Sequence, residues 1–263
     1  MKQKAGRVIF YLIPVVLVVI IIVSGTMFMK DFLEYKKAGD EYASLEEMMT
    51  EAPGTEAAAD STGGNAGDAY GYVPLHINAD ELLAVNEDFV GVIDIPALNT
   101  RYPIVASKDN EDYLHVTFEK QKNFAGCIFL DCNASKDFSD WNTFVFGHNM
   151  KNGSMFGHLK DFLRDETLCD TYPYIWIYTP ERALKYRIFA YYTASYTSDS
   201  YDDFYGSEGY DDYISRIRSR SRYQPENMPD VDFGKRPELI TLSTCSGNQH
   251  TERFLVHGAL VKE

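Results

Sequence analysis

The sequence predicts a mainly β domain, a barrel or a sandwich of eight short strands, that follows a single transmembrane helix. Three observations support this fold class. Short runs rich in β-branched and aromatic residues alternate with turn signals along most of the chain. Two stretches with helical periodicity, 154–163 and 207–222, interrupt those runs. Near the N-terminus, residues 8–29 carry no charge, which is typical of a segment that crosses a membrane.

The uncharged run 8–29 follows Lys2, Lys4 and Arg7. As a helix it is about 33 Å long, enough for a hydrocarbon core of about 30 Å. The basic flank predicts that residues 1–7 stay in the cytoplasm and that the rest of the chain lies outside. A cleaved signal peptide is the alternative, but the apolar run is longer than a usual signal core and no A-x-A site follows it. We therefore expect an uncleaved single-pass anchor in the cell membrane.

Residues 30–71 connect this anchor to the folded domain. The first part has spaced apolar residues among charged ones and predicts a juxtamembrane helix. The second part, from 53, consists mostly of Gly, Ala, Ser, Thr, Asp and Asn, which offer little apolar surface to bury. We expect a flexible tether there and a folded domain at 72–263.

Within that domain, a helix start is predicted at 78–81, and the spacing of apolar residues predicts helices at 154–163 and 207–222. The predicted strands lie between and around these helices. In chain order they are 89–95, 101–105, 126–130, 143–146, 174–178, 184–193, 238–244 and 253–261.

The composition argues against one class of partner and offers no metal or cofactor site. The chain of 263 residues has a formal net charge of -14, whereas nucleic-acid binding needs clustered Lys and Arg. The four cysteines match neither a zinc-site spacing nor a CxxC pattern. Cys127 lies in an apolar run and is predicted to be core, while Cys132 and Cys169 lie near turns and are predicted to be exposed. We expect no nucleic-acid partner, no metal and no cofactor.

Cys245 and Arg253 are the first candidates for chemistry. Cys245 closes one predicted strand and Arg253 opens the next, so an antiparallel pairing brings thiol and guanidinium to the same end of the sheet. A cysteine is a good nucleophile as thiolate, and a nearby cation favours that form and can stabilise a substrate oxyanion. The alternative for Cys245 is a buried small hydrophobe. The polar loop directly after Cys245 favours a position at the rim of the sheet over a buried one.

A proton carrier is the missing part, and His148 is the best candidate. It follows the short apolar run that ends at Phe146 and so is expected at the mouth of a strand. His250, five residues after the cysteine in the connecting loop, is the rival. A loop holds an imidazole less firmly than a strand end does, which favours His148. His257, inside the last strand, is predicted to be structural.

These residues resemble those of a known family, the class B sortases, which are membrane-anchored cysteine transpeptidases of Gram-positive bacteria. The resemblance rests on TLSTC ending at Cys245 with Arg253 downstream, on FGHNM around His148, and on NGSMF ending at Phe156. It implies a closed eight-stranded barrel of sortase type, with an N-terminal helix and a long helix between the sixth and seventh strands, where 207–222 falls.

The resemblance also implies roles for further residues. Asn110, Leu114 and Ser243 match positions that line the class B peptide groove. Two positions depart from the pattern of some members. Gly247 replaces an acidic residue, which leaves open whether a carboxylate orients His148, and Phe146 replaces a tyrosine, which removes a hydroxyl from the groove.

The implied reaction is cleavage of a short C-terminal sorting signal after Thr in secreted proteins, followed by transfer to an amine of peptidoglycan or its lipid-linked precursor. Cys245, His148 and Arg253 are the implied catalytic residues of a monomeric enzyme. Three alternatives stay open: a secreted cysteine hydrolase, a pilin-polymerising sortase, and a non-catalytic membrane-tethered binding module. The sequence leaves the sorting motif, the acceptor and the cargo undefined.

Overall fold

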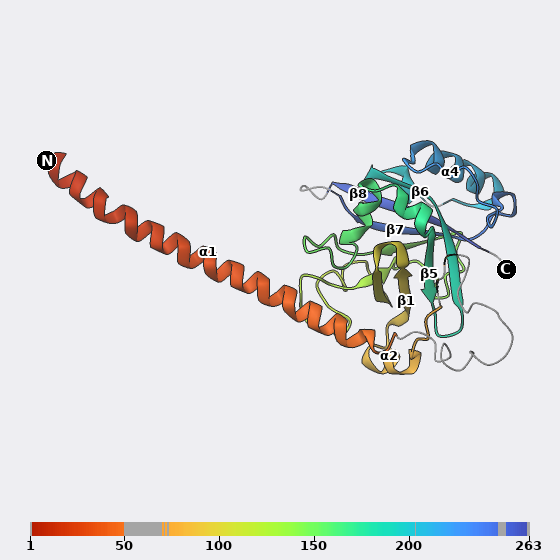
Figure 1. Ribbon diagram of the computed structural model, residues 1–263, viewed down its shortest axis with the longest axis horizontal. Coiled ribbons are helices and arrows are strands. Elements are labelled where there is room, and N and C mark those ends of the chain that lie inside the picture. The colour runs from red at the N-terminus through yellow and green to blue at the C-terminus, as the bar shows by residue number, and fades with distance from the viewer. Residues whose placement is uncertain are drawn as a thin grey trace. The chain divides into compact units, whose positions relative to one another are not determined.

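In the computed structural model, which describes residues 2–49, 70, 72, 74–202, 204–246 and 251–261, eight strands close into a barrel (Figure 1). Their order around the barrel is β1-β2-β3-β4-β7-β8-β6-β5. The pairs β2–β3 and β4–β7 are parallel, and the others are antiparallel. The predicted closed barrel is therefore confirmed. The strands are β1 (Phe89–Ile95), β2 (Thr100–Ala106), β3 (Ile128–Leu130), β4 (Asn142–Phe146), β5 (Tyr174–Tyr178), β6 (Ala183–Ser195), β7 (Leu239–Cys245) and β8 (Glu252–Leu260).

The strands form where β-branched and aromatic residues alternate or run together, and their inward side chains fill the barrel. β4 shows the alternation most clearly, since Thr143 and Val145 are fully buried whereas Asn142, Phe144 and Phe146 are half-buried on the outer face. Short helices connect the strands. They are α2 (Ala79–Val85), η1 (Pro96–Leu98), η2 (Gly157–Leu163), α3 (Thr167–Thr171), η3 (Asp199–Tyr201) and η4 (Phe233–Lys235).

The long helix predicted at 207–222 is present as α4 (Gly206–Arg220), between β6 and β7. Its apolar side chains recur at three- and four-residue intervals and are buried against the outer face of the sheet. Tyr210 and Tyr213 are fully buried, and the Tyr213 hydroxyl donates to the Ser200 carbonyl at 3.0 Å. The helix therefore covers the β6–β8 side of the barrel (Figure 1).

The prediction of a helix with α-helical periodicity at 154–163 is wrong in helix type. A 3-10 helix, η2, forms from Gly157, and Met155 before it has a left-handed φ of 55°. Phe156, Leu159 and Phe162 are fully buried, as predicted, but they recur every three residues. That spacing fits the period of a 3-10 helix, which places such residues on one face, better than the 3.6-residue period of an α-helix.

The chain divides into two units, Met1–Glu41 and Tyr42–Glu263. The first lies within helix α1 (Lys2–Glu46). Among the described residues, the stretch Leu12–Glu46 of α1 is long and apolar enough to cross a membrane by length and composition. Of the predicted tether, 53–71, only Tyr70 belongs to the described residues.

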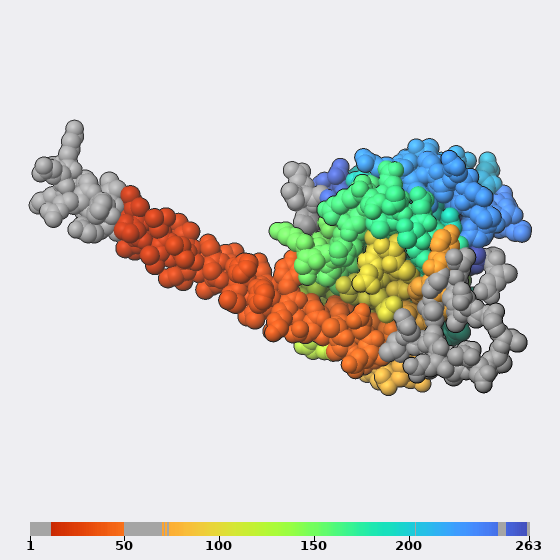
Figure 2. All heavy atoms as spheres, in the orientation of Figure 1, coloured from red at the N-terminus to blue at the C-terminus, as the bar shows by residue number. Residues whose placement is uncertain are grey.

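The second unit begins earlier than the predicted 72. Leu45 and Met49, which the sequence assigns to the juxtamembrane segment, are each only 1% exposed and pack in the core with Leu82 and Phe118. The Tyr42 hydroxyl donates to the Gly126 carbonyl at 2.7 Å. In Figure 2 the orange spheres of this last turn of α1 lie against those of α2, and the Asn78 N–H donates to the Met48 carbonyl. These residues belong to the domain.

Replacing Leu45 by alanine is therefore expected to lower the free energy of unfolding of the domain by about 2–4 kcal/mol, because it opens a cavity in a packed core. Urea denaturation of the full chain in detergent micelles measures this change. The exposed neighbour Glu47→Ala is the control and should change stability by less than about 0.5 kcal/mol. Equal, small changes in both variants would show that the turn only rests on the surface.

Candidate active site

The strand register brings the thiol, guanidinium and imidazole to one rim of the barrel. Cys245 at the end of β7 pairs with Arg253 at the start of β8, so the predicted antiparallel pairing is confirmed. β4 runs parallel to β7 with Phe146 opposite Ser243, and the Gly147 N–H continues the ladder to the Ser243 carbonyl at 3.2 Å. His148 is the next residue, so it leaves its strand level with Cys245. Three adjacent strands thus each contribute one candidate residue.

His148 is held by its backbone and by its ring. Its carbonyl accepts from the Phe156 N–H at 2.9 Å, and its Nε2–H donates to the Leu114 carbonyl at 2.7 Å. A carbonyl can only accept, so Nε2 carries a proton and proton exchange with a substrate is left to Nδ1. The ring stacks on His115, with centroids 5.8 Å apart. A fixed tautomer and orientation are what an acid–base imidazole needs.

Gly147 makes this placement possible. A Cβ at that position would lie 2.4 Å from the Ile128 side chain and 2.7 Å from the Phe156 ring. The chain therefore passes so close to its neighbours that only glycine fits just before His148.

Arg253 is half-buried at the opposite side of Cys245 from β4. Its guanidinium carbon lies 5.9 Å from the centroid of the Tyr196 ring, and its Nη1–H donates to the Glu252 carbonyl at 3.2 Å. The Ser246 N–H also donates to that carbonyl, at 3.0 Å, which ties the residue after the thiol to β8. These contacts keep a permanent positive charge at the rim beside the sulfur.

The four cysteines differ in their surroundings. Cys245 and Cys132 are half-buried and all four are free thiols, while Cys127 is core, as predicted. Cys169 was predicted to be exposed and this is wrong: it is fully buried in α3, and burial raises the pKa of its thiol well above the usual value. Cys245 alone lies on the strand pair that also carries the rim arginine.

The three predicted substrate-binding residues have different hydrogen-bond partners. Leu114 supplies the carbonyl that fixes His148. Asn110 has a left-handed φ of 64°, donates from Nδ2 to Asp131 at 2.9 Å and accepts the Cys132 N–H at 2.8 Å. The Ser243 hydroxyl shares a hydrogen bond of 2.8 Å with the Tyr201 hydroxyl. Gly247 and the rival base His250 lie outside the described residues.

Tyr201 is a residue that sequence reasoning missed. It ends η3, hydrogen-bonds Ser243 and stacks on Phe144 at 5.5 Å. Burial raises its pKa, and the hydrogen bond with Ser243 and the positive charge of Arg253 oppose that rise. The phenol therefore lies within electrostatic reach of the rim. No periodicity marks it, because a short 3-10 turn between strands places it.

His257 is structural, as predicted. It is 1% exposed and stacks on Tyr192 at 5.3 Å. Its Nδ1 shares a hydrogen bond of 2.9 Å with the Thr241 hydroxyl, whereas Nε2 has no partner among the described residues. Burial lowers the pKa of His257 to about 3. The ring is neutral near pH 7 and takes no part in acid–base chemistry.

This burial predicts acid sensitivity. In the unfolded chain a histidine has a pKa of about 6.5, so the unfolded state binds the extra proton as the pH falls below that value. The contribution of the neutral His257 ring to the free energy of unfolding is fully present above about pH 6.5 and is lost progressively down to about pH 3. Between pH 6.5 and 4.5 the native chain should lose about 2 kcal/mol more of unfolding free energy than His257→Gln. Urea titrations at both pH values measure it, with the exposed His76→Gln as control. Parallel losses in native and His257→Gln chains would show that His257 titrates normally.

The fold and the rim define a class of protein, closed β-barrels with a cysteine at a strand end, and comparison with known proteins makes the class specific. Residues 93–261 match the family described as "Sortase: Sortase domain". Sortase B of Listeria monocytogenes is 34% identical over 186 residues, which cover 69% of this chain and 73% of that protein. Sortase B of Staphylococcus aureus is 24% identical over 259 residues, which cover 95% and 96%.

Solved structures agree. Sortase B of Bacillus anthracis in complex with AAEK1 matches with a TM-score of 0.69 at 26% identity, over 88% of this chain and 100% of that chain. Sortase B of Clostridium perfringens matches with a TM-score of 0.63 at 27% identity, over 70% and 99%. The chain belongs to the sortase family, in class B. Members of this family are cysteine transpeptidases that act on sorting signals and peptidoglycan.

Proposed function

We propose that this chain cleaves a short sorting signal after Thr in secreted proteins and joins the new carboxyl end to an amine of peptidoglycan or its lipid-linked precursor. The register that places Cys245 opposite Arg253 and level with His148 is the observation that carries the proposal. It puts a nucleophile, a permanent cation and an oriented imidazole at one rim.

The first half of the reaction forms a thioester. The Cys245 thiolate attacks the threonine carbonyl, and negative charge develops on the carbonyl oxygen. Arg253, together with backbone N–H groups at the rim, stabilises that oxyanion. His148 donates its Nδ1 proton to the leaving amine as the C–N bond breaks, which leaves an acyl group on the sulfur and a neutral imidazole.

The second half releases the thioester to an amine. The incoming amine loses its proton to Nδ1 of His148 as it attacks the thioester carbonyl, and the Cys245 thiolate leaves. The histidine returns to its starting state, so no external oxidant or energy source is needed. In this proposal helix α1 anchors the enzyme with its N-terminus in the cytoplasm and the catalytic domain outside, where secreted proteins and wall precursors meet.

The test uses the full chain in detergent micelles with a library of fluorogenic pentapeptides of the type x-P-x-T-x, with and without glycinamide. Mass spectrometry should find cleavage after Thr and, when the amine is present, a product that carries it. Cys245→Ala should yield neither product. A free acid as the sole product at every amine concentration would favour a cysteine hydrolase, and an intact fold that processes no peptide would favour a binding module.

A further inference from the structure

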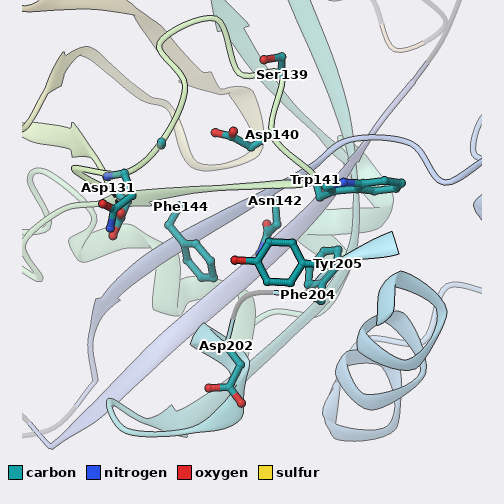
Figure 3. A pocket seen from close by; sticks show the side chains of 11 residues that line it. Asp131, Ser139, Asp140, Trp141, Asn142, Phe144, Asp202, Phe204 and Tyr205 are labelled. Carbon is teal, nitrogen blue, oxygen red and sulfur yellow. Dashed lines mark hydrogen bonds between the residues drawn. The ribbon is translucent and has the colours of Figure 1, made fainter. Parts of the chain in front are cut away.

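A hollow of about 400 Å³ opens along the outer face of β4, beyond Phe144 from the rim. Its walls come from the residues after β3, from β4 and from the connection between η3 and α4. We call it the acidic pocket. Its defining residues are Asp131, Asp140, Trp141, Phe144, Asp202 and Tyr205, and Figure 3 shows the carboxylates of Asp131, Asp140 and Asp202 arranged around the Phe144 ring.

The pocket combines negative charge with aromatic surface. Three of its lining residues are aspartates, and none of the described residues that line it is Lys, Arg or His. Asp140 accepts from the Ser135 N–H and hydroxyl, so it is fixed in place, whereas Asp202 is exposed to solvent. Trp141 and Tyr205 are 42% and 80% exposed. Carboxylates beside exposed aromatic side chains attract a cation carried on an alkyl chain.

Side-chain contacts link the acidic pocket with the rim. Phe146 and Phe144 stack on the outer face of β4, with centroids 6.3 Å apart. Tyr201 stacks on Phe144 and hydrogen-bonds Ser243, two residues before Cys245. On the other wall, Asn110 donates to Asp131 of the pocket. Side-chain contacts therefore link Ser243, two residues before Cys245, through Tyr201 to Phe144, which lines the pocket.

The distance between His148 and the acidic pocket decides which part of a substrate can reach the pocket. At about 3.3 Å per residue, Phe144 lies about 13 Å and Asn142 about 20 Å along β4 from His148. The acceptor amine must touch the thioester, so it cannot be bound in the pocket. An extended peptide covers the same span in about four to six residues. The acyl half of the peptide stays bound through both steps, so it gains most from such a surface.

We propose that the acidic pocket binds a Lys or Arg side chain of the substrate protein, about five or six residues before the scissile bond and directly upstream of the sorting signal. The proposal rests on the proposed function for the identity of the peptide. It predicts that the enzyme prefers a positively charged residue upstream of the sorting signal. Asp202 and the aromatic side chains of Tyr205 and Trp141 determine this preference. The preference weakens as salt screens the carboxylates.

The experiment extends the best pentapeptide of the library by eight neutral residues at its N-terminus and moves a single Lys through them, with Gln at the same position as the reference. At one position of the Lys, the native enzyme should cleave the Lys peptide with a kcat/KM about five- to tenfold above its kcat/KM for the Gln peptide. Asp202→Asn should reduce that ratio to about twofold or less. Asp212→Asn, an exposed aspartate on α4 outside the pocket, should leave it unchanged.

A binding experiment tests the acidic pocket independently of the proposed catalytic function. The chain has two tryptophans, so a Trp176→Phe, Cys245→Ala double variant reports on Trp141 by fluorescence. The Lys peptide should bind several-fold more tightly than the Gln peptide, whether or not the native enzyme cleaves either. Equal cleavage at every register, or equal binding, would overturn the acidic pocket while leaving transpeptidation intact. Quenching by an N-acetylglucosamine oligomer but not by the Lys peptide would overturn it in favour of a sugar site.

Discussion

Replacing His148 by alanine is expected to lower kcat/KM for peptide processing by a factor on the order of 10³, because general acid–base catalysis contributes about 10²- to 10⁴-fold and His148 serves both steps. Adding imidazole to the reaction should restore a small part of the lost rate. The pH profile should lose the limb that depends on a protonated imidazole. Steady-state cleavage of the fluorogenic peptide measures all three effects in one assay.

His115 provides a matched control because its ring stacks directly on that of His148 while its side chain is exposed. His115→Ala should change kcat/KM by less than about threefold, since it removes stacking but no proton carrier. If His148→Ala keeps more than a tenth of the activity and His250→Ala abolishes it, the proton carrier lies in the loop after β7 and the present assignment is wrong.

The second large effect is expected at Arg253. Arg253→Ala should lower kcat by about 10²- to 10³-fold, which is the usual cost of removing one oxyanion donor, with little change in KM. Arg253→Lys keeps the charge but loses the planar fork, so it should recover only part of the rate. The split between kcat and KM matters because an oxyanion develops only in the transition state.

Arg164, which is 78% exposed and pairs with Asp161 in η2, is the control for removal of a surface cation. Arg164→Ala should leave kcat unchanged. A rise in KM without a fall in kcat for Arg253→Ala would instead assign this arginine to substrate binding.

Strand ends were the part of the site that the sequence could predict. Cys245, Arg253 and His148 each border a run of strand-forming residues, and their meeting at one rim follows from the pairing of neighbouring strands. The closed barrel and the helix between β6 and β7 came from resemblance to a family, because periodicity alone left a barrel and a sandwich equally open.

Tertiary contacts decided the rest. Tyr201 reaches Ser243 from a short 3-10 turn, and no local pattern predicts which strand such a turn faces. Leu45 and Met49 were assigned to a juxtamembrane helix because apolar residues among charged ones look alike in a core and at a membrane surface. Cys169 lies near a turn in sequence yet is covered on all sides in the fold. The acidic pocket brings residues of the stretch 131–144 together with residues of the stretch 202–205, which lie far apart in the chain.

The most direct test of the account is the intact mass of the enzyme during turnover. The full chain is mixed with excess cleavable peptide without an amine, quenched in acid and read by mass spectrometry. We expect a mass increase equal to the acyl fragment, located by peptide mapping on Cys245, cleared faster by glycinamide than by water, and absent in Cys245→Ala. Cleavage at full rate with no adduct on Cys245, or with the adduct on Cys132, would contradict it.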